Sequence, residues 1–174
     1  LDGAALDLSE FWNKLFNAQQ NIFHACSEDI DLIYHYAQQK TLKNVFDTQV
    51  GMSFLGHGLQ VSYQNALKTM LDVDIEKDQT RSDWLARPLS PEQLMYAAND
   101  VEYIMQLSEK VKAELSGKHL LDCALEDCRN LTHEIGQETP MAMLYHDVGN
   151  YRNSRKQLMQ LQQLAVWREQ MVKA

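Results

Sequence analysis

An aspartate and a tyrosine lie one turn apart in a segment that the sequence predicts to be helical. Ser90 can cap this helix and Pro91 suits its first position, and the segment stays helix-competent to about residue 115. Asp100 falls in the middle of the apolar face, and Tyr96 falls at its edge. A carboxylate that faces a core needs a cation or buried hydrogen-bond donors. Asp100 is therefore either a metal ligand with a tyrosine beside it or a structural residue. The apolar face consists of Ala97, Ile104, Leu107, Val111 and Leu115.

A second carboxylate repeats this pattern. Ser27 is a plausible cap for a helix that continues to residue 37, and Asp29 falls inside its apolar face. Favourable charge on a first helical turn explains only part of this position, because Asp29 faces inward. Two inward carboxylates could share a divalent cation such as Mg²⁺ or Mn²⁺, which take oxygen ligands. The apolar face here consists of Ile30, Ile33, Tyr36 and Ala37.

These two carboxylates make only half of a two-metal site. Two ions about 4 Å apart each need a carboxylate and usually share another. Segments 47–49 and 74–76 resemble the missing acidic pair. The first has Gln49 where a glutamate is needed, and the second lies in an irregular segment, so neither completes the site.

Cationic and aromatic residues in the long irregular segment 72–89 could meet a nucleic-acid strand through phosphate contacts and stacking. The alternative is a solvated loop that Trp84 anchors. His24 could also touch a phosphate, although a packed, hydrogen-bonded histidine is the better explanation. The candidate nucleic-acid contacts are His24, Lys77, Arg81, Trp84 and Arg87.

The elements that must position these residues alternate between short strands and helices. Apolar runs at 21–25 and 45–46 predict buried strands, each followed by a helix. Further helices are predicted near 10–20, 48–55, 62–71 and 120–135, with a connector at 136–150 and a final helix from residue 151.

Composition limits the possible classes of protein. The 174 residues are 45% hydrophobic and carry a formal charge of −8, which indicates a globular protein and argues against a non-specific nucleic-acid coat protein. No apolar run approaches the ~20 residues of a membrane span. The three cysteines fit a reducing compartment, so we expect a cytoplasmic protein without membrane partners.

Four blocks of this sequence resemble bacterial ribonuclease D. They are HACSED at 24–29, DTQ at 47–49, TRSDWLARPL at 80–89 and YAANDV at 96–101. The resemblance covers about residues 20–130. The final stretch, which includes LQQLAVWRE at 161–169, resembles the first helix of the helical HRDC domain that follows the nuclease in that family.

The resemblance implies an α/β fold of the RNase H-like 3′-5′ exonuclease type, truncated and mostly helical here. It implies removal of nucleotides from RNA 3′ ends, with tRNA precursors as substrates, by two Mg²⁺ or Mn²⁺ ions. Asp29 matches the acidic residue of the family's second motif, and Tyr96 and Asp100 match the third, which makes these three the expected catalytic residues. The expected domains are a partial exonuclease domain at 1–118, a helical connector at 119–150 and the start of an HRDC domain at 151–174.

Two departures from the family pattern bear on activity. The first motif, Asp-x-Glu on the opening strand, is absent together with the first three strands, and Cys26 replaces the usual glycine. We therefore expect a piece truncated at both ends that is itself inactive and self-associates through an unpartnered sheet edge. The alternative is a non-catalytic helical module that binds nucleic acid or protein.

Overall fold

The protein folds into two compact units, which are described separately. The computed structural model describes all residues except 1–5, 40, 76–81, 138–139, 147–153 and 173–174. The first unit comprises Leu1–Gly136 and the second Gln137–Ala174. Within the described residues, no helix is long and apolar enough to span a membrane.

A strand-helix-strand element lies at the centre of the first unit. Strand β1 (Asn21–Phe23) pairs in parallel with β2 (Val45–Asp47), and helix α2 (Ser27–Ala37) connects them. Helix α1 (Ser9–Phe16) precedes β1. The two predicted strands are confirmed, although β1 ends before Ala25, whose positive φ of 61° turns the chain away from the sheet.

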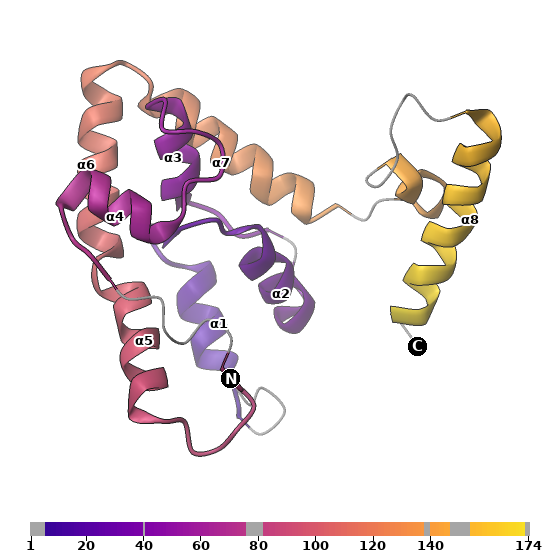
Figure 1. Ribbon diagram of the computed structural model, residues 1–174, viewed down its shortest axis with the longest axis horizontal. Coiled ribbons are helices and arrows are strands. Elements are labelled where there is room, and N and C mark those ends of the chain that lie inside the picture. The colour runs from indigo at the N-terminus through magenta and orange to yellow at the C-terminus, as the bar shows by residue number, and fades with distance from the viewer. Residues whose placement is uncertain (1–5, 40, 76–81, 138–139, 147–153, 173–174) are drawn as a thin grey trace. The chain divides into compact units, whose positions relative to one another are not determined.

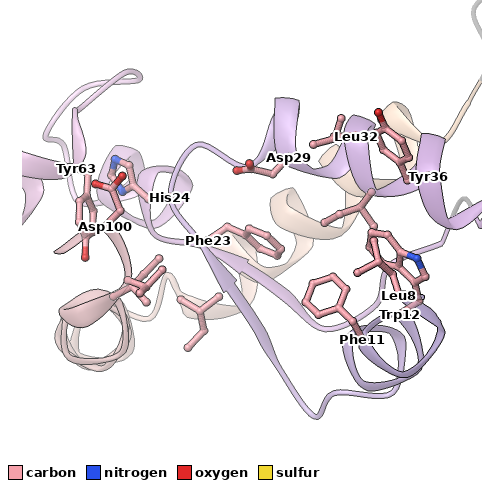
Figure 2. A pocket seen from close by; sticks show the side chains of 14 residues that line it. Leu8, Phe11, Trp12, Phe23, His24, Asp29, Leu32, Tyr36, Tyr63 and Asp100 are labelled. Carbon is pink, nitrogen blue, oxygen red and sulfur yellow. The ribbon is translucent and has the colours of Figure 1, made fainter. Parts of the chain in front are cut away.

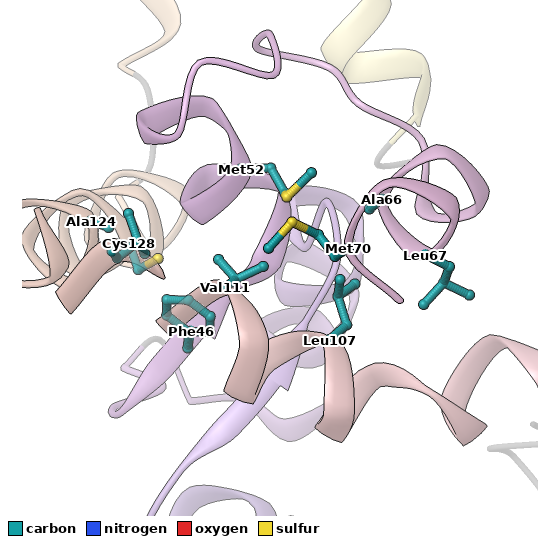
Figure 3. Close-up of a cluster of buried hydrophobic side chains, with 10 residues drawn as sticks. Phe46, Met52, Ala66, Leu67, Met70, Leu107, Val111, Ala124 and Cys128 are labelled. Atoms are coloured by element: carbon teal, nitrogen blue, oxygen red, sulfur yellow. The ribbon is translucent and has the colours of Figure 1, made fainter. Parts of the chain in front are cut away.

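The core of this unit forms on both faces of the sheet, because successive strand residues point in opposite directions. Phe46 belongs to the larger cluster, which α3 (Thr48–Phe54) and α4 (Tyr63–Leu71) help to enclose (Figure 3). Val45 packs on the other face with Ile30 of α2. Helix α7 (Leu121–Ile135) packs against α2, α3 and β2, so it belongs to the first unit and not to a separate connector.

The single long helix predicted from residue 90 to 115 is wrong, because it is two helices. Helix α5 (Pro91–Glu102) ends at Tyr103, and α6 (Ile104–Gly117) begins directly after it (Figure 1). The backbone N–H of Tyr103 bonds to the Val101 carbonyl, so the α-helical bonding pattern is interrupted there. The predicted apolar face is therefore divided: Leu107, Val111 and Leu115 are buried, whereas Ala97 is exposed.

The buried face of α2 also differs from the prediction. Tyr34 is buried, and Tyr36 is 59% exposed. The Tyr34 hydroxyl donates to the Thr132 carbonyl at 3.2 Å and accepts from the Leu42 N–H at 2.8 Å. These two bonds fix Tyr34 on the buried side of the helix, and Asp29 faces a solvent-accessible cavity instead of the core.

The second unit contains a 3₁₀ helix, η1 (Met141–His146), packed against α8 (Arg155–Val172). Ala165 of α8 is buried. The predicted final helix is thus confirmed from Arg155 onward. Its assignment to an HRDC domain stays a prediction.

The close approach of α3 to α6 gives a test of the core packing. A Cβ atom on Gly51 would lie 2.6 Å from Val111 Cγ1 and 3.1 Å from Phe46 Cζ. We expect Gly51→Ala to lower the free energy of unfolding, measured in urea, by about 1–3 kcal/mol. Gly117→Ala is the matched control, because a Cβ there meets no heavy atom within 4 Å, and it should be neutral or stabilising by up to about 1 kcal/mol. Equal stability of the two variants would contradict the packing described here.

Candidate active site

The two candidate carboxylates line one cavity of about 720 Å³ in the first unit. Asp29 enters it from α2 and Asp100 from α5 (Figure 2). His24 and Tyr63 lie near Asp100 at one end of the cavity, and apolar side chains line the other end. Those apolar side chains include Leu8, Phe11, Trp12, Leu32 and Tyr36.

Both carboxylates are easier to protonate than ordinary aspartates. Burial raises the pKa of Asp100. Burial also raises the pKa of Asp29, and the negative charges of Glu28 and Asp47 add to this effect. A cation in the cavity would stabilise both ionised carboxylates, so their chemistry fits a divalent metal. Among the described residues, no group of three or more His, Cys, Asp or Glu side chains could hold a metal ion.

His24 connects the cavity to the end of the sheet. Its Nδ1 lies 2.9 Å from Thr48 Oγ1, and its Nε2 lies 2.9 Å from the Val61 carbonyl oxygen. Burial lowers the pKa of His24, which keeps the ring neutral at pH 7. Both ring nitrogens are thus engaged within the protein, and contact of His24 with RNA stays a prediction.

Tyr63 is a cavity residue that the sequence analysis missed. Its ring centroid lies 5.5 Å from that of His24, and burial raises the pKa of its hydroxyl to about 12, with a smaller contribution from the charge of Asp100. The predicted helix at 62–71 was correct and is confirmed as α4. The sequence around Tyr63, in the first turn of this helix, does not indicate that it would lie near Asp100, which is 37 positions later in the chain.

Tyr96 is not among the residues that line the cavity. It lies one turn before Asp100 on α5 and packs against Trp84, with ring centroids 5.8 Å apart and planes inclined by 55°. The Arg87 guanidinium donates to the carbonyl oxygens of Trp84 and Ala86 and so helps to fold this loop. The other two candidate nucleic-acid contacts, Lys77 and Arg81, lie outside the described residues.

Asp47, in the segment that resembled the missing acidic pair, has a structural role. Its carboxylate is 1% exposed and accepts four backbone N–H groups. Two of them cap α3, and the other two come from the turn between β1 and α2. The sequence contained the signal for the first half of this role, since an aspartate between a strand and a helix is a favoured N-cap. The four donors are the N–H groups of Ala25, Cys26, Gln49 and Val50.

The family described as 3′-5′ exonuclease matches residues 4–116 of this sequence. The chain belongs to this exonuclease family. Its carboxylate cavity lies within the matched range, because every residue that lines the cavity falls between positions 8 and 104. Exonucleases of this family depend on divalent metals, in agreement with the chemistry of Asp29 and Asp100.

Relatives of this exonuclease chain carry the name ribonuclease D. The protein of that name from Shewanella sp. (strain ANA-3) is 36% identical over 97% of the chain, and that from Pseudomonas paraeruginosa is 35% identical over 86%. The crystal structure of Escherichia coli RNase D covers 97% of the chain with a TM-score of 0.80 and 28% identity. The predicted RNase H-like exonuclease fold is thus confirmed. The chain spans 44%, 39% and 45% of these three proteins.

The role of Asp47 can be tested by one atom exchange. Asp47→Asn removes the charge and directs an NH₂ group toward backbone donors. We expect it to lower the free energy of unfolding by about 2–4 kcal/mol. The control is Ser62→Ala, which removes an exposed cap whose oxygen accepts from the Asn65 N–H at 3.3 Å and should cost about 0.5–1 kcal/mol. Similar losses in urea unfolding would show that Asp47 is an ordinary cap.

The cavity carboxylate Asp100 should behave in the opposite way. Because its folded-state pKa is raised, the native protein binds this proton more tightly than the unfolded chain does. The resulting penalty is absent below the unfolded-state pKa and complete above the folded-state pKa. Metal-free Asp100→Asn should therefore equal or exceed the parent in stability at neutral pH, and the difference should vanish in acid. A loss of about 2–4 kcal/mol in urea unfolding would instead assign Asp100 a structural role.

Proposed function

We propose that the chain forms part of a ribonuclease D-like 3′-5′ exoribonuclease that trims the 3′ ends of tRNA precursors in the cytoplasm. The observation that carries the proposal is the shared cavity of Asp29 and Asp100, two carboxylates separated by 71 positions. Relatives named ribonuclease D support RNA as the class of substrate. The resemblance of residues 161–169 supports α8 as the first helix of an HRDC domain.

In this proposal Asp29 and Asp100 hold Mg²⁺ or Mn²⁺ ions. Such ions supply positive charge that activates water and stabilises the phosphoryl oxygens of a phosphodiester. Tyr96, one turn from Asp100, orients the attacking water and helps to remove its proton. Water attacks the terminal phosphodiester in line, and the bond to the leaving 3′ oxygen of the preceding nucleotide breaks.

The loop that begins at Ser82 supports the RNA part of the proposal. Trp84 offers a ring for base stacking, and Arg87 adds a cation within three residues. Lys77 and Arg81 add two cations just upstream in the sequence, and His24 completes the proposed set of contacts. Phosphate contacts and stacking together are the usual means of holding a single strand without sequence preference.

A non-catalytic module that binds nucleic acid or protein is the second candidate function. The small number of metal ligands favours it. In the described part of the chain, two carboxylates line the cavity, which is fewer than two metal ions require. In the same part of the chain β1 pairs only with β2, which supports self-association through the other edge of β1.

Measurements of metal binding and RNA cleavage distinguish the exoribonuclease from the non-catalytic binding module. We expect the chain alone to bind Mn²⁺ weakly in calorimetry and to leave RNA intact, because two carboxylates compete poorly with the hydration of two ions. A chimaera in which the remaining part of the Shewanella relative completes this chain should shorten RNA from the 3′ end. A folded chimaera without activity would favour the binding module.

The chimaera also tests the role of Tyr96. Tyr96→Phe keeps the ring and removes only the hydroxyl, so Mn²⁺ affinity should be retained while kcat falls by roughly 10²- to 10⁴-fold, the range of a lost proton-transfer group. Tyr145→Phe in the second unit is the control and should leave kcat unchanged. An equal kcat for Tyr96→Phe and the parent would remove Tyr96 from the mechanism.

A further inference from the structure

Gln93 is the buried residue of α5, a helix whose other described residues are exposed or half-buried. Its side chain is in a capping box, in which Oε1 accepts from the Ser90 N–H at 2.9 Å and Ser90 Oγ accepts from the Gln93 N–H at 3.2 Å. Capping requires only the oxygen of the amide. The buried nitrogen therefore needs another explanation.

The amide nitrogen of Gln93 holds the loop that precedes α5. Nε2 donates to Ser82 Oγ at 3.2 Å and to the Asp83 carbonyl oxygen at 3.0 Å, so both of its hydrogens are used. Within the loop, Asp83 Oδ1 accepts from the Leu85 N–H at 2.9 Å. The loop is thus closed on itself, and the buried side chain of Gln93 fastens it to the helix.

The residue that directly follows this attachment is Trp84. Tyr96 lies three positions after Gln93, and residues at this spacing share one side of a helix. Fixing Asp83 to Gln93 therefore brings Trp84 onto Tyr96, where their ring centroids are 5.8 Å apart. Tyr96 lies one turn before the cavity residue Asp100 on α5. An aromatic surface there suits a nucleobase, which stacks on such rings whatever its identity.

A second capping box in the chain shows that the nitrogen has a separate role. Ser154 and Gln157 form the same reciprocal pair at the start of α8, at 2.7 and 3.4 Å. Gln157 is exposed, and no bond from its Nε2 to another described residue is present. Of these two capping glutamines, Gln93 has a loop bonded to its nitrogen and Gln157 has none among the described residues.

We propose that Gln93 is a positioning residue whose amide nitrogen fastens loop 82–90 to α5 and holds Trp84 against Tyr96 as a stacking surface for the terminal base of an RNA strand. The part of this inference that concerns RNA rests on the proposed function. The attachment of the loop does not, and it is measurable in the protein without RNA.

The first test measures the environment of Trp84. In a chain with Trp12→Phe and Trp167→Phe, Trp84 is the single tryptophan, and its fluorescence reports its exposure to acrylamide. Gln93→Glu keeps the capping oxygen and removes both donors, so quenching of Trp84 should increase while circular dichroism stays unchanged. Gln157→Glu makes the same exchange in the other capping box and should leave quenching unchanged. Equal quenching of Trp84 in Gln93→Glu and the parent would overturn the proposal.

Ser82→Ala provides a milder version of the same test, because it removes one acceptor and leaves α5 intact. It should increase quenching in the same direction and by less. Should Gln93→Glu fail to fold, Ser82→Ala alone decides, and no change in quenching would again overturn the attachment.

The second test measures affinity for a short oligouridylate by fluorescence anisotropy. Gln93→Met removes the donors without adding charge, and Trp84→Ala removes the stacking ring. Each should weaken binding by up to roughly 100-fold, the upper range for a lost base stack. Combining them should weaken binding no further, because both act through one surface. Additive losses would overturn the stacking role of Gln93, whereas absence of RNA binding by the parent would count against the proposed function and leave the fluorescence result valid.

Discussion

The buried carboxylate of Asp47 is the interaction on which the first unit depends. It accepts four backbone N–H bonds, two from the turn after β1 and two from the beginning of α3. These bonds hold the two segments together at one end of the sheet. A buried negative charge is stable only when donors surround it, and here four backbone N–H groups act as donors. The direction in which α2 leaves the sheet, and with it the position of Asp29, follows from this bond set.

Much of the local structure could be predicted from the sequence because its signals are local. The apolar runs at β1 and β2 and the cap of α4 each lie within a few residues of the element they specify. Spacing also predicts the inward position of Asp100, which is half-buried in the cavity, but it fails for Asp29, which is exposed and faces the cavity instead of the core. Their meeting in one cavity required knowledge of the fold, which the resemblance to ribonuclease D supplied.

The errors have a common physical origin in contacts between distant residues. Helical periodicity continues through Tyr103, yet the helix is interrupted there. Helix α6 packs on α3, α4 and β1, whereas α5 is bonded through Gln93 to the loop that precedes it. Tyr34 and Tyr36 are equally apolar in sequence, and only the Leu42 and Thr132 partners of Tyr34 decide which one is buried. The second role of Gln93 has the same origin, because the loop that uses its nitrogen lies ten residues upstream, outside the local capping pattern.

The hydrogens around His24 can be counted. The Val61 carbonyl only accepts, so Nε2 carries a hydrogen, and in the neutral ring Nδ1 must take the single hydrogen of the Thr48 hydroxyl. The Phe23 carbonyl, 3.0 Å from that hydroxyl, then goes without it. In the imidazolium form Nδ1 donates, and the hydroxyl turns its hydrogen to Phe23. Protonation of His24, which lines the cavity, therefore reverses the direction of its hydrogen bond with Thr48 and gives the carbonyl of Phe23, the last residue of β1, a hydrogen-bond donor.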